Sequence, residues 1–365
     1  MSEHKYIISG GGTGGHIFPA IAIANGIKAK HADAEILFVG AKGKMEMEKV
    51  PQAGYDIIGL NITGMNRKSL LSNIPLIFKF VSSIIKAKRL LKKFKPSAVI
   101  GVGGYASSAV LKAAQSLDIP TVIQEQNSLP GKTNKMMAKK AKAICVAYDG
   151  LEKYFPKETI VKTGNPIRKE IINIEAKTSE ALKYFNIENE KPVVLIVGGS
   201  QGAKAINEAL ANNINQLAKI EANFIWQTGK IFFETAKATI ESNNVSNVYC
   251  ADFIKDMNYA YSVADVVVSR AGAIAISELC AVGLPSILVP LPTAAENHQM
   301  VNAMALVDKN AAILVENSKV NDELVPAITN LLGNQEEYNK LKTNIKSLAI
   351  TNSVDRIVEV IDNLI

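Results

Sequence analysis

The sequence predicts an α/β protein built from two doubly wound, Rossmann-like domains. The 365-residue chain is long for one core, and 48% hydrophobic with 21% charged residues is typical of a globular protein. Short, continuously apolar runs alternate with longer amphipathic stretches. Such runs indicate parallel strands covered by helices on both faces of a sheet. Two successive series of them indicate two domains whose ligands bind beyond the carboxyl ends of the strands.

The predicted strands fall into two groups. The first group lies at residues 6–9, 36–39, 56–60, 98–102, 121–125, 143–147 and 159–163. The second group lies at residues 193–198, 224–228, 248–250, 265–269, 286–290 and 312–315. Pro166 and the polar run after it, in TGNPIRKEI (163–171), indicate a linker. We therefore expect domains at 1–163 and 164–350, and an amphipathic helix within 351–365 that packs back toward the first domain.

The charge and the cysteines narrow the function classes. A formal net charge of +7 and a pI of about 9.0 favour an anionic partner: nucleic acid, a phosphorylated metabolite or an acidic membrane. The three cysteines are scattered without a CxxC pair, which indicates buried reduced thiols rather than disulfides or zinc ligands. The N-terminus leads directly into a strand pattern, so we expect no secretory signal, and no apolar run is long enough to span a bilayer.

Three glycine-rich turns follow predicted strands, at 10–16 (GGGTGGH), 101–108 (GVGGYASS) and 198–207 (GGSQGAKAIN). Glycine lets a ligand approach the backbone, and a helix N-terminus beyond the turn attracts phosphate. A tight turn without a ligand explains one such loop as well as a ligand site does, but it explains three poorly. The first loop contains GxGxxG, yet the next strand ends in Ala41 and Lys42 instead of the acidic residue that an NAD site needs.

A second pattern follows the strand that ends at Ser269. A Gly-Ala turn leads into a helix that should start near Ala273, and Glu278 lies in that helix among apolar residues. A carboxylate there can accept two hydrogen bonds from a ribose diol while the helix N-terminus faces a diphosphate. The surrounding residues make a solvated helix face the weaker explanation for Glu278. His298 and Gln299 should lie beside the same cleft, after Pro292.

Six motifs together resemble the MurG family of peptidoglycan glycosyltransferases, of glycosyltransferase family 28. They are GGTGGHIFPA, GVGGYAS, QEQNSLPGKTNK, TGNPIR, GGSQGAKAIN and RAGAIAISEL, and their order and spacing cover essentially the whole chain. The resemblance implies the GT-B fold, with two Rossmann-like domains facing a cleft. It also implies transfer of N-acetylglucosamine (GlcNAc) from UDP-GlcNAc to the C4 hydroxyl of undecaprenyl-pyrophosphoryl-N-acetylmuramyl-pentapeptide (lipid I).

The resemblance also implies roles for single residues. Thr13, Gly14 and Gly15 would approach the donor sugar and diphosphate, and Asn127 would contact the GlcNAc group. The C-terminal domain would bind UDP-GlcNAc through Arg168, Ser200, Ile254, Ala273, Ile274, Ala275, Glu278 and Gln299. Ser200 would contact the diphosphate, Ile254 the uracil by its backbone, Glu278 the ribose and Gln299 the sugar hydroxyls. The family often has His where this chain has Gln124, and Gly where it has Ser108, which leaves an acid–base role at position 124 in doubt.

The reaction of this family inverts the anomeric centre, which implies a single displacement. A base must take the acceptor proton, and the departing diphosphate must be stabilised. The chain has no DxD motif, so we expect helix N-termini, loop amides and Arg168 to stabilise the diphosphate without a metal ion or other cofactor. His16 is the first candidate for the base, because histidine titrates near neutral pH and His16 follows a glycine loop at a helix start. Glu125 is the second, although it can equally orient the Asn127 loop.

Residues 73–95 (NIPLIFKFVSSIIKAKRLLKKFK) combine apolar and basic side chains. Ile77, Val81, Ile84, Ile85 and Lys88 follow helical spacing, and six basic residues crowd into 86–95. By itself the pattern fits a core-facing helix with a solvated charged face. With a polyprenyl-linked acceptor, it predicts binding to an anionic membrane surface, on the cytoplasmic face of the bacterial inner membrane.

Two rival functions stay open. Another UDP-sugar enzyme of the same fold, such as a glycolipid glycosyltransferase or a UDP-GlcNAc 2-epimerase, would share the nucleotide motifs. A nucleic-acid binder would explain the charge, but the basic residues cluster without interleaved aromatic side chains, so we expect no nucleic-acid partner.

Overall fold

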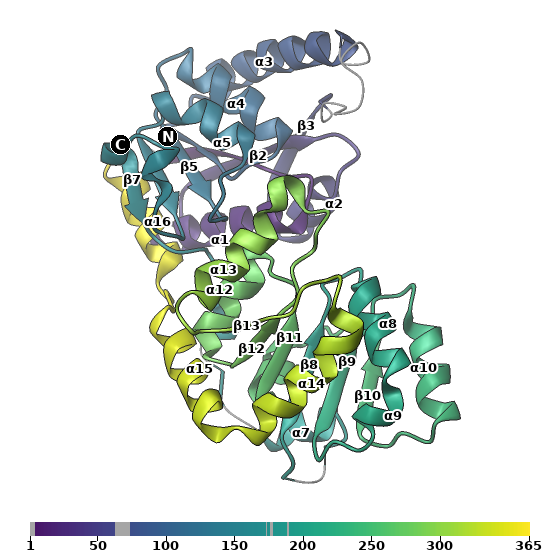
Figure 1. The fold of residues 1–365 in the computed structure, drawn as a ribbon. Coiled ribbons are helices and arrows are strands. Elements are labelled where there is room, and N and C mark those ends of the chain that lie inside the picture. The colour runs from purple at the N-terminus through teal and green to yellow at the C-terminus, as the bar shows by residue number, and fades with distance from the viewer. Residues whose placement is uncertain (1–3, 63–73, 173, 176–177, 188–189) are drawn as a thin grey trace. The chain divides into compact units, whose positions relative to one another are not determined.

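The computed structural model describes residues 4–62, 74–172, 174–175, 178–187 and 190–365. The chain divides into two compact units, with unit 1 formed by 1–167 and 352–365 and unit 2 by 168–351. Each unit contains one parallel sheet with helices against it, as Figure 1 shows. All the predicted strand runs form strands, which confirms the α/β class and the two Rossmann-like sheets.

The sheet of unit 1 has the order β3-β2-β1-β4-β5-β6-β7. Its strands are β1 (Lys5–Ser9), β2 (Glu35–Ala41), β3 (Asp56–Leu60), β4 (Ala98–Gly101), β5 (Thr121–Glu125), β6 (Ala143–Val146) and β7 (Ile160–Lys162). Its α-helices are α1 (Gly14–Lys30), α2 (Glu46–Gln52), α3 (Ile74–Phe94), α4 (Tyr105–Gln115), α5 (Lys132–Met137) and α16 (Ser353–Asp362).

The sheet of unit 2 has the order β10-β9-β8-β11-β12-β13. Its strands are β8 (Val193–Val197), β9 (Asn223–Gln227), β10 (Val248–Ala251), β11 (Val266–Ser269), β12 (Ser286–Leu288) and β13 (Ile313–Leu314). Its α-helices are α6 (Lys169–Ile172), α7 (Ser179–Tyr184), α8 (Lys204–Asn212), α9 (Ile214–Leu217), α10 (Phe233–Ser242), α11 (Met257–Val263), α12 (Ala273–Val282), α13 (His298–Val307), α14 (Val320–Gly333) and α15 (Gln335–Ser347).

Both sheets are buried on both faces. In β1, Ile7 belongs to one apolar core of unit 1, whereas Tyr6 and Ile8 belong to the other. In β8, Leu195 and Ile196 divide between the two cores of unit 2 in the same way. Successive side chains of a strand point to opposite faces, so helices on both faces need a continuous apolar run. The structure thus confirms that the continuously apolar runs are parallel strands covered by helices on both faces.

The C-terminal helix α16 packs on α1 within unit 1. The two helices approach closely at Gly26, where a β-carbon would lie 2.2 Å from Val354 Cγ1. Beyond the end of α1, His31 Nε2 lies 3.0 Å from Asp362 Oδ1. At the other end of α16, Ser353 Oγ donates to the Asn165 carbonyl at 2.6 Å. The closing helix thus belongs to the same compact unit as residues 1–167.

The strand order of each unit reverses at one point. In unit 1 the chain moves outward in opposite directions from β1 and β4, and in unit 2 from β8 and β11. Ligands of such sheets bind at this switch point, beyond the carboxyl ends of the two strands. The predicted glycine loops follow β1, β4 and β8, and the Gly-Ala turn follows β11. Topology therefore places all these turns at switch points.

Candidate active site

In unit 1, the loops after β1 and β4 lie against each other. Gly104 has a φ of +89°, and a β-carbon on it would lie 2.5 Å from the Gly11 carbonyl oxygen. A β-carbon on Gly10 would lie 2.0 Å from Val102 Cγ2. The glycines are therefore needed for close contact between two loops, in addition to any contact with a ligand.

His16 lies in the first turn of α1, above this loop contact. Its Nδ1 is 3.1 Å from the Gly11 carbonyl oxygen and 3.4 Å from Thr13 Oγ1. A β-carbon on Gly103 would lie 2.8 Å from His16 Nε2, so this second loop passes close to the ring. Because a carbonyl only accepts, Nδ1 carries the proton of the neutral ring, which makes Nε2 the basic nitrogen.

Glu125, at the end of β5, is a buried carboxylate with four hydrogen-bond donors. Its Oε1 accepts from the Asn127 backbone N–H at 2.9 Å and from Asn127 Nδ2 at 3.2 Å. Its Oε2 accepts from the Gly131 N–H at 3.0 Å and from Asn134 Nδ2 at 2.8 Å. The carboxylate therefore fixes the whole loop from 126 to 134, which is the structural role weighed for it from the sequence.

Gln124, where the family often has His, belongs to a buried amide network. Its Nε2 donates to Asn165 Oδ1 at 3.0 Å, and its side-chain oxygen accepts from Gln126 Nε2. Asn165 Nδ2 in turn donates to the Gln126 carbonyl at 3.0 Å. Gln124 is fully buried. The side chain thus joins β5 to Asn165, near the end of the first segment of unit 1.

In unit 2, the glycine loop after β8 packs against the turn after β9. Gly202 has a φ of +75°, and a β-carbon on it would lie 1.9 Å from the Thr228 carbonyl oxygen. Gly229 makes the reverse contact, because its β-carbon would lie 2.2 Å from the Gln201 carbonyl oxygen. Ser200, at the tip of the loop, is exposed. Backbone contacts therefore hold the loop in place. Ser200, the residue predicted to contact the diphosphate, is at the surface.

Gln227, the last residue of β9, was not identified from the sequence. Its Nε2 donates to the Gly199 carbonyl at 3.1 Å, and its Oε1 accepts from the Ile254 N–H at 2.8 Å. One buried amide thus connects the glycine loop to the backbone expected to contact uracil. The sequence signal that could have identified Gln227 is its position at the carboxyl end of a parallel strand, where ligand-binding residues lie.

Glu278 lies in α12, which begins at Ala273 as predicted. Glu278 is only 6% exposed, so it does not form a solvated helix face. Its Oε1 accepts from Arg168 Nε at 3.0 Å, and its Oε2 accepts from Arg168 Nη2 at 3.3 Å and from the Tyr261 hydroxyl at 3.2 Å. The structure therefore brings two predicted site residues together as a bidentate ion pair, with Tyr261 as a third member that sequence reasoning missed.

This cluster changes the ionisation of its members. Burial alone would lower the pKa of Arg168, but the Glu278 carboxylate more than offsets it, so the pKa is raised. Burial, and then the charge of Glu278, raise the pKa of Tyr261 well above its ordinary value. Tyr261 therefore stays a neutral donor to Glu278, and Arg168 stays a cation.

The turn into α12 has small, partly buried residues at its start. Ala273 is buried, whereas Ile274 and Ala275 are partly exposed. Gly272 precedes them as the N-cap and makes no side-chain cap. A helix end of this kind attracts an anionic group.

Gln299 lies in the first turn of α13, where the pattern after Pro292 placed it. Its Oε1 accepts from the Leu291 N–H at 2.9 Å, which fixes the side chain to the loop after β12. Arg270 secures the same loop, because its Nη1 donates to the Val289 carbonyl at 3.0 Å and to Asn317 Oδ1 at 2.7 Å. Burial lowers the pKa of Arg270.

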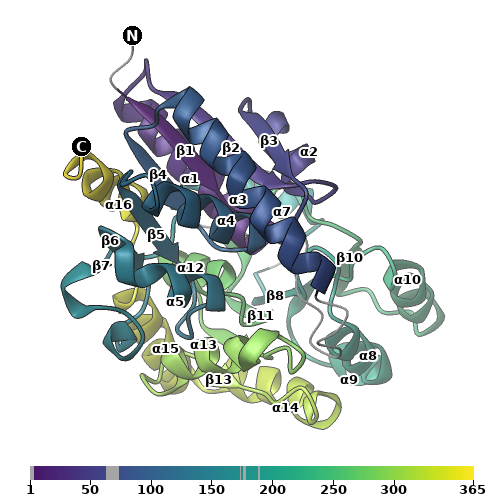
Figure 2. The ribbon, with the colours of Figure 1, turned by 90° about the horizontal axis from the view of Figure 1, so that it is seen from above.

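Helix α3 packs on α4 (Figure 2). Three of its apolar side chains are exposed. Phe78 is 74% exposed, Val81 48% and Ile85 47%, and the three positions share one helical face. Ile84, expected in the same set, instead packs against the core, while residue 73 and the side chain of Ile77 lie outside the described residues. Among the described residues, no helix combines the length and the apolar character needed to cross a membrane.

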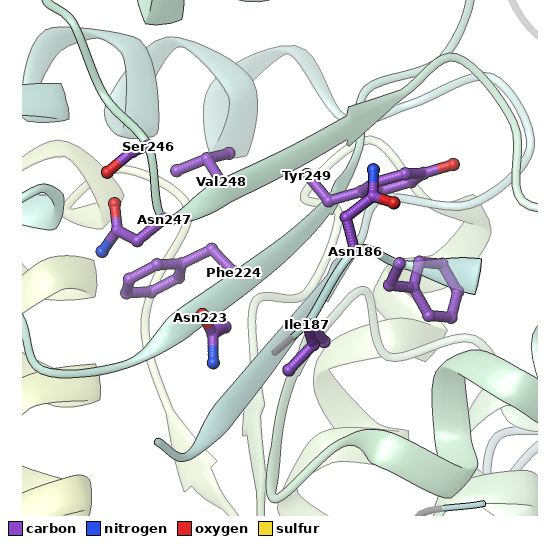
Figure 3. A pocket seen from close by; sticks show the side chains of 9 residues that line it. Asn186, Ile187, Asn223, Phe224, Ser246, Asn247, Val248 and Tyr249 are labelled. Atoms are coloured by element: carbon purple, nitrogen blue, oxygen red, sulfur yellow. The ribbon is translucent and has the colours of Figure 1, made fainter. Parts of the chain in front are cut away.

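One cavity of about 160 Å³ lies in unit 2, at the opposite end of the sheet (Figure 3). Asn223 and Val248, the first residues of β9 and β10, line it together with Phe185 and Asn247. In parallel sheets the ligand lies at the carboxyl ends of the strands. This cavity is therefore separate from the candidate site of unit 2.

Among the described residues, no group of three or more His, Cys, Asp or Glu side chains could hold a metal ion. The expectation that catalysis needs no metal stays a prediction.

Family models match both units of the chain. The glycosyltransferase family 28 N-terminal domain matches residues 6–146, and the glycosyltransferase family 28 C-terminal domain matches residues 193–359. These matches, with two switch-point sheets and their glycine loops, define the class of protein as a family 28 glycosyltransferase of the GT-B fold.

Relatives narrow the class further. A Flavobacterium psychrophilum protein is 48% identical over 365 residues, covering 100% of this chain and 99% of that protein. A Parabacteroides distasonis protein is 47% identical with the same coverage. Both are named UDP-N-acetylglucosamine--N-acetylmuramyl-(pentapeptide) pyrophosphoryl-undecaprenol N-acetylglucosamine transferase. The chain belongs to this family, the MurG family, which confirms the resemblance found in the motifs.

Solved structures agree with this assignment. The crystal structure of Acinetobacter baumannii MurG matches with a TM-score of 0.80 and 28% identity, covering 99% of each chain. A UDP-GlcNAc 2-epimerase from Neisseria meningitidis bound to UDP-GlcNAc matches with a TM-score of 0.67 at 17% identity, covering 98% of this chain and 99% of that one. The second match shows a shared fold alone.

Proposed function

We propose that this protein transfers GlcNAc from UDP-GlcNAc to the C4 hydroxyl of the muramyl sugar of lipid I, which makes lipid II for peptidoglycan. The observation that carries the proposal is the 47–48% identity, over the full chain, to relatives named for this transfer. Structures named as UDP-GlcNAc 2-epimerases match at 12–17% identity, which gives the epimerase alternative less support.

The donor site that we propose is the switch point of unit 2. The N-terminus of α12, with Ala273, Ile274 and Ala275, would face the diphosphate together with Ser200. Ile254 would offer its carbonyl to the uracil N–H, because Gln227 already accepts from its N–H. Gln299 would donate from its Nε2 to a sugar hydroxyl, because its Oε1 already accepts from Leu291.

Binding of the ribose requires an exchange of partners at Glu278. Arg168 and Tyr261 occupy the carboxylate before the donor binds. We propose that the ribose hydroxyls replace the Arg168 N–H groups on Glu278. The guanidinium that is released then donates to an oxygen of the diphosphate, where negative charge develops as UDP departs. The cation is thus directed to the leaving group only when a ribose is bound.

His16 is the base that we propose for the acceptor hydroxyl. The hydroxyl proton moves to Nε2, the hydroxyl oxygen bonds to C1 of GlcNAc, and the bond from C1 to the UDP oxygen breaks with inversion. Glu125 is a positioning residue, because four donors already occupy its two oxygens. The contacts expected of Thr13, Gly14, Gly15 and Asn127 with the donor stay predictions.

We also propose that α3 binds the cytoplasmic face of the inner membrane, where the lipid-linked acceptor lies, and that the reaction serves cell shape and division. Phe78, Val81 and Ile85 would insert into the surface, and Arg89 and Lys92, which are exposed further along the helix, would face anionic headgroups. Each basic residue contributes on the order of 1 kcal/mol near such a surface.

Two experiments test these proposals. Purified protein with radiolabelled UDP-GlcNAc should label a short-chain lipid I analogue, and conversion of the labelled sugar into its C2 epimer without acceptor would indicate an epimerase instead. Vesicles with anionic lipid should bind the protein, and a Phe78→Ser, Val81→Ser, Ile85→Ser triple variant should bind them weakly. Ile231→Ser, at an 88% exposed apolar position of unit 2, is the control that should bind as the unaltered protein does.

A further inference from the structure

Glu46, the first residue of α2, is a buried carboxylate to which neither the motifs nor the proposed reaction gives a role. It is 1% exposed. Its Oε1 accepts from the Ala41 N–H at 2.9 Å, at the end of β2, and its Oε2 accepts from the Gly12 N–H at 2.9 Å. A buried charge is costly unless hydrogen bonds stabilise it, and here both bonds come from the backbone.

The peptide group that joins Gly11 to Gly12 lies between Glu46 and His16. Its N–H, on Gly12, donates to Glu46 Oε2. Its carbonyl oxygen, on Gly11, lies 3.1 Å from His16 Nδ1 and accepts a hydrogen bond from the Nδ1–H group. Carboxylate, peptide and imidazole therefore form one chain of hydrogen bonds.

The surrounding glycines fit the carboxylate closely. A β-carbon on Gly11 would lie 2.1 Å from Glu46 Oε1, and a β-carbon on Gly40 would lie 2.5 Å from Glu46 Cγ. Any other residue at either position would displace the carboxylate. The Gly12 amide is also committed to Glu46, so this part of the loop is built to hold the histidine rather than a phosphate.

Hydrogen bonds in series polarise one another. A carboxylate on the peptide N–H draws negative charge onto the carbonyl oxygen, which strengthens the bond from Nδ1–H. That bond fixes the tautomer with a basic Nε2 and stabilises the imidazolium that forms when Nε2 takes a proton. A carboxylate bonded directly to histidine has the same effect in serine proteases.

We propose that Glu46 is a positioning residue for His16 and acts through the Gly11–Gly12 peptide. This inference rests on the proposed function, in which His16 is the base. Nδ1 keeps its proton, and the proton from the acceptor hydroxyl rests on Nε2 until solvent removes it. Thr13 Oγ1 and the Gly103 backbone also face the ring, and neither carries a charge.

Glu46→Gln tests the inference, because an amide places an N–H₂ group against one of the two backbone donors. We expect kcat to fall about 10- to 100-fold, the range found for groups that orient a metal-bound histidine. KM for UDP-GlcNAc should change less than about twofold, since the residues proposed to bind the uracil and the ribose belong to unit 2. Glu48→Gln, an exposed carboxylate on the same helix, is the matched control and should keep kcat.

Nitrogen-15 NMR of labelled histidine, with His16→Ala for assignment, supplies a readout that needs no substrate. The unaltered protein should show His16 protonated at Nδ1, and Glu46→Gln should increase the Nε2-protonated share and lower the titration midpoint of the ring. A loss of kcat with an unchanged His16 spectrum would overturn the inference, as would a His16 protonated mainly at Nε2 in the unaltered protein. If Glu46→Gln does not fold, this last measurement still decides.

The same data separate the two proposals. A correct NMR pattern in a protein that transfers no GlcNAc to lipid I contradicts the proposed function and leaves the hydrogen-bond chain in place. Active enzyme with the wrong tautomer contradicts the inference alone.

Discussion

Replacing Glu278 by Gln should weaken UDP binding by about 5- to 30-fold. In the bound state we expect two hydrogen bonds from the ribose hydroxyls to the carboxylate. A bond to a charged group contributes about 1.5–3 kcal/mol and a neutral one about 0.5–1.5, so two bonds lose roughly 2 kcal/mol.

The unaltered protein must first give up the pair between Glu278 and Arg168. The Arg168 side chain is 39% exposed, so breaking this pair costs at most about 1 kcal/mol, a cost that the Glu278→Gln variant does not have. The net loss is about 1–2 kcal/mol, and about 1.4 kcal/mol corresponds to a tenfold change in Kd.

Calorimetry with UDP and 2′-deoxy-UDP, on both proteins, forms a double-mutant cycle. The 2′-deoxy ligand lacks one proposed partner of Glu278, so Glu278→Gln should weaken its binding less than it weakens the binding of UDP. The coupling free energy between Glu278 and the 2′-hydroxyl should be about 1 kcal/mol. Glu208→Gln is the control, because Glu208 lies in the same unit in an exposed pair with Lys204. Equal losses for both ligands would refute a ribose contact, and unaltered UDP affinity would refute the site.

Three further predictions concern the loops of unit 2 and the ion pairs of α16 in unit 1. Gly202→Ala should abolish UDP binding or folding, because its β-carbon would lie 1.9 Å from a carbonyl oxygen. Gly43→Ala is the control, because Gly43 has a φ of +69° but open space around it, and thermal unfolding should show a loss of stability of only about 1–2 kcal/mol. Gln227→Leu leaves the buried Ile254 N–H unsatisfied, whereas the Gly199 carbonyl keeps its bond from the Gly202 N–H. Denaturant titration should therefore show a loss of about 1–3 kcal/mol, with weaker UDP binding in any folded fraction, and stability equal to that of the unaltered protein contradicts the role of this amide. Burial by itself raises the pKa of Asp362, but hydrogen bonds from Lys30 and then from His31 lower it overall. The carboxylate therefore stabilises the fold above its unfolded pKa, and this contribution is lost as pH falls through the lower folded pKa. The stability deficit of Asp362→Asn should be full above about pH 5 and should narrow below about pH 4, and a deficit independent of pH would contradict the ion pair.

Most of the fold could be predicted from local sequence patterns. Continuous apolar runs such as 193–198 require cover on both faces, and the structure provides it with two cores in each unit. The sequence also predicted the start of α12 near Ala273 and the closing helix that begins at Ser353, because a Gly-Ala turn and amphipathic spacing are local signals. At α3 the predicted apolar set was only partly right, because Ile84 packs against the core whereas its neighbour Ile85 is exposed.

What the sequence by itself determined about this protein is the class of fold, the glycine turns and, through its motifs, the family. Tertiary structure alone decided which polar groups meet: Glu278 with Arg168, 110 positions away, Glu46 with Gly12, 34 away, and Gln227 with Ile254, 27 away. The physical reason is that apolar periodicity is set by neighbouring residues. A buried hydrogen bond depends instead on where two separate strand ends are brought together by the order of the sheet.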